Sequence, residues 1–168
     1  MRVRGRRDFV TTGVGSLVAL AMKPGLAPVA AQEARPALPP DQVSEFVRVA
    51  HGDLDRTTRM LDEQPALLNA TWDWGAGDFE TALGAASHMG HREIAGLLLG
   101  RGARLDLFCA AMMGMLDVVR PVVEAYPAAV DWLGPHGISL LRHALAGDAD
   151  DVADFLRSKG AASPAPVG

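Results

Sequence analysis

The sequence lacks several features that would place it in a familiar functional class. It has one cysteine, Cys109, in 168 residues, so no internal disulfide can form, and apolar neighbours predict that this thiol is buried. There is no glycine-rich phosphate loop, Gly-x-Ser-x-Gly elbow, His-Glu-x-x-His helix or paired-cysteine metal motif. These absences predict a protein that is not an enzyme, with no catalytic residues, no bound metal and no cofactor.

Long hydrophobic runs are missing as well. The longest mainly apolar stretch, Phe9–Met22, has 14 residues, which is fewer than the roughly 20 that span a bilayer. Basic residues precede this stretch, and a run of small residues follows it and ends at Ala31. This order is typical of a cleavable export signal. We therefore expect a signal peptide at residues 1–31 and no stable membrane anchor after cleavage.

The start of this leader resembles the twin-arginine export motif. Arg6, Arg7 and Phe9 carry the resemblance in the segment Arg6-Arg7-Asp8-Phe9-Val10, and the small residues fit cleavage after Ala31. An ordinary Sec signal and an uncleaved basic anchor are the alternatives. The resemblance implies a periplasmic or secreted bacterial protein that crosses the membrane by the twin-arginine route.

Positive charge is scarce beyond the leader. Residues 1–31 hold five of the sixteen basic residues and one of the twenty acidic ones, so the remainder carries a formal net charge of −8. Nucleic acids and anionic membranes are bound through clustered Lys and Arg. The charge therefore argues against both and favours a basic protein surface as the partner.

Proline marks the ends of the folded part. Residues 32–41 contain three prolines and predict an extended linker, and residues 162–168 contain two and predict a flexible tail. Between them, residues 42–161 form one domain of ordinary size.

The segment 81–103 has the clearest local pattern, which is a short helix, a glycine turn, a second helix and a glycine stop. It resembles one ankyrin repeat. The residues that carry the resemblance are Thr81, Leu83, Ala86, Gly90-His91, Ile94, Leu97-Leu98-Leu99 and Gly102-Ala103. One such unit cannot bury its apolar face alone, so neighbouring copies are expected.

Glycines that divide two helices locate the other copies. They are Gly52, Gly90, Gly114 and Gly147, with spacings of 38, 24 and 33 residues against a family period of about 33. The long first spacing accommodates an extended loop at 69–79, and the short second one leaves almost no hairpin at 102–107. The resemblance implies an all-α fold, an ankyrin-repeat solenoid of about four helix-turn-helix units with loop fingers.

Two of these loops, at 72–80 and 132–137, hold the candidate binding residues, because indoles, acids and a histidine gather there. The predicted partner-binding residues are Trp72, Asp73, Trp74, Asp78, Glu80, His88 and His136. Exposed indoles ringed by acids suit a basic protein surface. Alternatively, each Trp folds back over its own repeat, and Trp132 is then the stronger candidate for the core.

The favoured hypothesis is an exported, monomeric protein–protein interaction module that binds a periplasmic partner through its concave loop-and-helix surface. A second hypothesis is a small-ligand or metal-binding protein with a pocket between the two loops, and a third is a hydrolytic enzyme built from the same groups. Both alternatives require His88 and His136 to converge. His51 and His91 are expected to have structural roles, in packing and in a turn.

The leader generates the first prediction. Changing Arg6 and Arg7 together to Lys should leave the precursor in the cytoplasm, because the twin-arginine pair is replaced while the positive charge is kept. Cell fractionation with immunoblotting of precursor and mature forms measures this. Normal secretion of the variant would indicate the Sec route instead.

Overall fold

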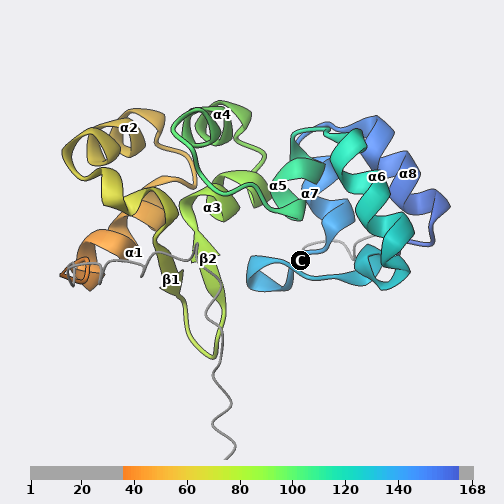
Figure 1. Ribbon diagram of the computed structural model, residues 1–168, viewed down its shortest axis with the longest axis horizontal. Helices are drawn as coiled ribbons and strands as arrows, with labels where there is room; N and C mark the ends of the chain where they lie inside the picture. The colour runs from red at the N-terminus through yellow and green to blue at the C-terminus, as the bar shows by residue number, and fades with distance from the viewer. Residues whose placement is uncertain (1–35, 163–168) are drawn as a thin grey trace, which may run out of the picture. The chain divides into compact units, whose positions relative to one another are not determined.

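The computed structural model of this chain describes residues 36–162, which form a mainly helical unit (Figure 1). The predicted export signal, including Arg6, Arg7, Phe9 and Ala31, lies outside the described residues, as does the tail from residue 163. None of the described helices is long and apolar enough to cross a membrane. The helices are α1 (Pro40–Val49), α2 (Leu54–Glu63), α3 (Ala82–His88), α4 (Arg92–Gly100), α5 (Leu107–Met112), α6 (Leu116–Ala125), α7 (Leu140–Ala146) and α8 (Asp150–Ser158).

Shorter elements connect these helices. They are the 3-10 turns η1 (Pro65–Asn69), η2 (Pro127–Asp131) and η3 (Pro135–Gly137) and the strands β1 (Thr71–Asp73) and β2 (Phe79–Thr81). The helix α1 already contains Pro40 and Asp41, which the sequence analysis placed in the linker. Proline is compatible with the first turn of a helix because its missing N–H has no partner there in any case.

Consecutive helices pack as pairs, α1 with α2, α3 with α4, α5 with α6 and α7 with α8. The first helices of successive pairs also contact one another in the order α1, α3, α5 and α7. Figure 1 shows this row, with the hairpin β1–β2 projecting below α3. The all-α expectation is confirmed apart from this small sheet.

Side-chain caps set the starts of four helices. Asp53, Thr81, Asp106 and Ser139 precede α2, α3, α5 and α7, and each side-chain oxygen accepts a hydrogen bond from the backbone N–H three residues later. Such a cap satisfies one of the four free N–H groups at a helix start and stabilises the helix by about 1 kcal/mol. The caps thus fix where α2 and three of the first helices, α3, α5 and α7, begin.

The segment predicted as an extended loop forms a regular hairpin. Strands β1 and β2 pair antiparallel, with Thr71 opposite Thr81, Trp72 opposite Glu80 and Asp73 opposite Phe79. At the turn the backbone of Gly75 and Gly77 has φ of +124° and +84°, a region that glycine enters at little steric cost. Glu80, at the centre of β2, is buried, whereas its strand neighbour Phe79 is exposed.

The far ends of the first helices pack against each other at backbone distance. A Cβ on Gly90 would lie 2.1 Å from the carbonyl oxygen of Ala146, and one on Gly147 would lie 2.0 Å from that of Met112. Arg92 ties these ends together, because Nη1 donates to the carbonyls of Met112 (2.8 Å) and Gly147 (2.9 Å), and Nη2 donates to that of Met113 (3.0 Å). A cation suits the negative end of a helix dipole.

Apolar side chains form two adjoining core clusters. One lies mainly among α1 to α4 and contains Phe46 and Leu98, and the other lies among α5 to α8 and contains Leu141 and Leu156. Cys109 is completely buried in the first cluster, as expected. Burial raises the pKa of this thiol to about 11, so it is protonated and unreactive at neutral pH.

The contacts of Arg92 predict its contribution to stability. Replacing Arg92 with Met keeps most of the aliphatic stem but removes three charge-assisted hydrogen bonds, so the free energy of unfolding should fall by about 2 kcal/mol. Chemical denaturation measures this change. The control is Arg59→Met, on the exposed side of α2, which should change the free energy of unfolding by less than about 0.5 kcal/mol. Equal effects in both variants would contradict the bridging role of Arg92.

Candidate functional site

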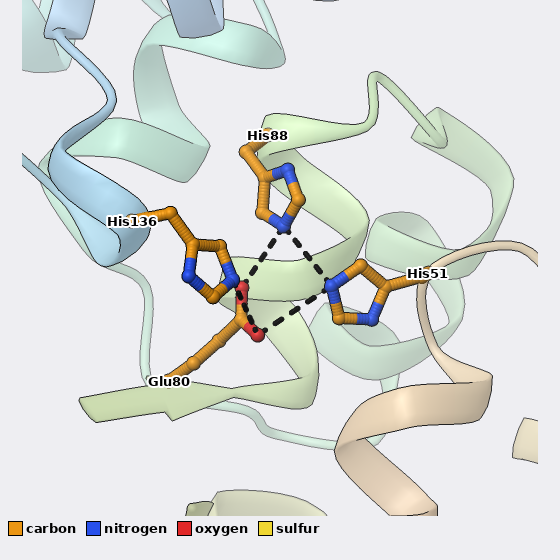
Figure 2. A group of neighbouring side chains, drawn as sticks. All are labelled: His51, Glu80, His88 and His136. Carbon is orange, nitrogen blue, oxygen red and sulfur yellow. Dashed lines mark hydrogen bonds and ion pairs between the residues drawn. The ribbon is translucent and has the colours of Figure 1, made fainter. Parts of the chain in front are cut away.

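Four titratable side chains from distant parts of the sequence converge beside the hairpin, as Figure 2 shows. They are His51, Glu80, His88 and His136, and one nitrogen or oxygen atom of each lies within 4.8 Å of the corresponding atoms of the others. His51 follows α1, Glu80 lies on β2, His88 ends α3 and His136 lies in η3. We call this group the His/Glu cluster.

Glu80 lies at the centre of the cluster and is only 1% exposed. The indole Nε1 of Trp74 donates to its Oε2 at 2.7 Å. Nε2 of His88 lies 3.0 Å from Oε1, and Oε1 has no well-formed hydrogen bond among the described residues. Burial opposes ionisation of Glu80, but His88, Trp74 and the positive potential of His51 outweigh it and hold its pKa below the usual value. The site therefore contains a buried carboxylate, one oxygen of which lacks a well-formed hydrogen bond.

The rings of His51 and His88 meet through their Nε2 atoms, which are 3.1 Å apart. Nδ1 of His51 lies 3.1 Å from the carbonyl oxygen of Val47. A carbonyl can only accept, so Nδ1 carries the hydrogen and Nε2 of a neutral ring keeps its lone pair. That lone pair points into the cluster, and the Nε2 atom itself lies 3.5 Å from Oε2 of Glu80.

His136 reaches the cluster from the other side and is held by Asp78. Its Nδ1 lies 2.7 Å from Oδ2 of Asp78, and its backbone N–H donates to Oδ1 at 2.8 Å. The backbone hydrogen bond is the main reason that the pKa of Asp78 lies below its usual value. Nε2 of His136 then faces Glu80, 3.4 Å from Oε2.

The backbone conformation of His136 indicates that its hydrogen bonds to Asp78 hold this residue in place. Its φ is 58° and its ψ is 21°, a left-handed conformation that is uncommon for residues other than glycine. Such conformations persist where the surroundings enforce them, and they concentrate at functional sites. Here the enforcing contact is the pair of hydrogen bonds from His136 to the hairpin residue Asp78.

The structure brings together most of the residues predicted from the sequence. Glu80, His88 and His136 belong to the cluster, and Trp74 and Asp78 bind to its members directly. The condition that His88 and His136 converge is met, with ring centroids 5.2 Å apart.

Two other predicted residues lie apart from the cluster. Trp72 packs against the first core cluster, and Asp73 accepts a hydrogen bond from the Gly75 amide within the hairpin turn. Trp132, expected to be the better core candidate, is instead 45% exposed. The reason is that it follows η2 in extended conformation, and neighbouring Ala129 and Val130 occupy the core position.

His51 is the member that sequence reasoning missed, because it was assigned to packing. The available signal was its position: His51 and His88 both lie at the ends of first helices in neighbouring pairs, and α1 contacts α3. His91, which shares a sequence neighbourhood with His88, is not in the cluster. Gly90 separates the two residues and turns the chain between them.

Comparisons with known proteins assign no family to the chain. No protein-family model matches it, and no curated protein is similar enough to count as a relative. The function of the His/Glu cluster is therefore inferred from its own residues.

The contact between Asp78 and His136 generates a prediction about how the site is assembled. Asp78→Ala should release the loop around His136, so that the amides of His136, Gly137 and Ile138 exchange hydrogen about tenfold faster. Hydrogen exchange with mass spectrometry measures this.

The matched control is Asp73→Ala, because the hydrogen bond of Asp73 stays within the hairpin turn. It should leave exchange in the loop unchanged. Exchange that is equal in both variants would show that Asp78 does not hold the loop.

Proposed function

We propose that this protein binds one divalent transition-metal ion at the His/Glu cluster. The observation that carries the proposal is the convergence of His51, Glu80, His88 and His136, whose ligand atoms lie within 4.8 Å of one another although their residues span 85 positions of the chain. The carboxylate of Glu80, buried beneath three imidazoles of which His51 and His136 remain partly exposed, is costly to keep ionised unless something compensates its charge. A cation does so directly.

The separations suit a small metal ion. Zinc–ligand bonds of 2.0–2.1 Å directed to the corners of a tetrahedron place the ligand atoms about 3.3–3.4 Å apart. Four separations in the cluster are 3.0, 3.1, 3.4 and 3.5 Å. These four separations are close to that spacing, and the remaining pairs of ligand atoms, all within 4.8 Å of one another, must close to it when a metal binds.

The partners of the ligands also suit a metal site. Metal-binding histidines usually donate their other ring N–H to a carboxylate or a backbone carbonyl, which fixes the ring and its tautomer. His136 has Asp78 in this position and His51 has the carbonyl of Val47. Trp74 orients the carboxylate of Glu80 in the same way, because its Nε1–H donates a hydrogen bond to one carboxylate oxygen.

The donor set indicates the class of metal. Calcium and magnesium prefer six or more oxygen ligands, whereas imidazole nitrogens suit Zn²⁺, Fe²⁺, Ni²⁺ and Cu²⁺. Three nitrogens and one oxygen therefore favour a transition-metal ion, with Zn²⁺ as the first one to test. Of the hypotheses from the sequence, this proposal follows the second, a small-ligand or metal-binding protein with a pocket between the two loops, rather than the favoured interaction module.

We further propose that the scaffold is an ankyrin-type solenoid exported to the periplasm. Support for the solenoid comes from four successive helix pairs, stacked first helices and the glycine-centred turn at Gly90. Support for export is limited to the leader sequence, with its Arg6-Arg7 pair. A metal site suits such a scaffold because the hairpin β1–β2, the loop before α7 and the ends of first helices lie close together and supply ligands from several helix pairs.

Protein binding is a second candidate, favoured by exposed apolar side chains beside the metal site. Phe79 and Leu133 are 61% and 63% exposed, and with Phe108 they line a hollow of about 380 Å³ between the hairpin and the loop before α7. Exposed aromatic side chains are common anchors in protein interfaces. The acidic charge after the leader favours a basic partner, and metal binding would rigidify both walls of this hollow.

The metal proposal is tested by titrating the full chain, freed of metal by chelation, with Zn²⁺ in a calorimeter. We expect one ion per chain and higher thermal stability with Zn²⁺, since a ligand at 100 times its dissociation constant stabilises the folded state by about 2.7 kcal/mol. His88→Ala and His51→Ala should each weaken binding at least tenfold, because each removes one ligand.

His91→Ala is the matched control, since it removes a nearby histidine that lies outside the cluster. It should bind Zn²⁺ as the wild type does. The proposal is wrong if the wild type binds no stoichiometric metal, or if His91→Ala weakens binding as much as His88→Ala does.

A further inference from the structure

We infer that the metal ion keeps one coordination position open, and that this position receives the carboxylate of a small organic acid whose apolar body rests on Trp74. This inference rests on the proposed metal function. It adds a ligand class, a direction of approach and a role for Arg48, a residue that the metal proposal does not use.

The direction of approach follows from which ligands are accessible. His51 and His136 line a shallow hollow of about 330 Å³, together with Arg48 and Trp74. Glu80 is buried and His88 nearly so, so these two ligands close the rear of the site. A ligand from solvent therefore reaches the metal between His51 and His136.

The spacing of the three rings agrees with an opening on that side. Ring centroids are 4.9 Å apart for His51 and His88 and 5.2 Å apart for His88 and His136, but 6.4 Å apart for His51 and His136. The widest gap thus faces the hollow. With four protein ligands already bound, a ligand that enters through this gap is the fifth, a coordination number that zinc sites reach by expansion.

Charge selects an anion for this position. A divalent ion with three neutral imidazoles and the Glu80 carboxylate has a formal net charge of +1, which the outer carboxylate of Asp78, 2.7 Å from Nδ1 of His136, offsets. An anion is therefore held by direct coordination to the ion and by Arg48. Arg48 adds a guanidinium at the edge of the hollow. Its Nε and Nη2 atoms donate to Glu45, so these two bonds orient the group and leave the Nη1 edge for a ligand. Neither Glu45 nor Asp78 lines the hollow.

Trp74 selects the rest of the ligand. Its Nε1–H is already bonded to Glu80, so its 40% exposed surface offers the hollow only the apolar part of the indole. An aromatic or aliphatic body can pack there while its carboxylate reaches the metal and Arg48. Inorganic anions lack such a body and gain nothing from the indole.

The probe is benzoate, titrated into the full chain loaded with Co²⁺. The visible absorption of bound Co²⁺ reports its coordination, so binding at the open position changes the spectrum directly. We expect saturable changes with benzoate, weaker binding of acetate, and no change with the neutral analogue benzamide. Arg48→Met should weaken benzoate binding about tenfold without changing Co²⁺ affinity.

The matched control is Arg56→Met. Arg56 also pairs with Glu45 but does not line the hollow, so its replacement should leave benzoate binding unchanged. The inference is overturned if the Co²⁺ spectrum ignores benzoate, if benzamide or inorganic phosphate binds as well as benzoate does, or if both arginine variants behave alike.

These outcomes separate the two proposals. If Co²⁺ gives no bound spectrum, or if His88→Ala and His91→Ala bind it equally, the metal proposal fails and the open position fails with it. A normal Co²⁺ spectrum that depends on His88 but ignores benzoate would retain the metal site and reject only the ligand.

Discussion

The burial of the Glu80 carboxylate is the constraint on which the site depends. An ionised carboxylate removed from water costs several kcal/mol unless hydrogen bonds or opposite charge compensate it. The chain meets this cost with groups from four separate elements: the hairpin supplies Trp74, α3 supplies His88, the end of α1 supplies His51 and the loop before α7 supplies His136. Glu80 is thus the group that the inward-facing side chains of these four elements share as a contact.

Hydrogen bonds alone compensate Glu80 incompletely. Oε1 has no well-formed hydrogen bond among the described residues, and the two Nε2 atoms of His51 and His88 approach within 3.1 Å, where only one proton fits between them. Positive charge at the centre of the cluster completes the compensation of this carboxylate. A divalent ion supplies the same compensation to all four groups and uses the lone pairs that their outer partners leave free. This is the physical basis for favouring the metal over an interaction surface alone.

Local pattern predicted the helices well because capping and turn chemistry are local. Gly90 and its preceding and following helices follow from a few neighbouring residues, and so does the cap at Thr81. The candidate loops were also predicted, since indoles and acids concentrated in a loop are visible in the sequence.

The convergence of the site was not predictable, because 37 residues separate His51 from His88 and their contact depends on how α1 stacks on α3. The exposure of Trp132 was missed for the same reason: flanking apolar residues do not show which of them the next helix pair covers.

The irregular spacing of the helix pairs explains how the site forms at all. The connection from α4 to α5 contains no strand, while the connections on either side of it are long, with the hairpin before α3 and the η3 loop before α7. A full hairpin before α5 would separate the β1–β2 hairpin from the η3 loop. Without it, η3 contacts α3 and α7 also contacts α3, which brings His136 to Glu80 across the intervening pair. The short connection before α5 thus lets side chains from the first, second and fourth helix pairs meet at one point.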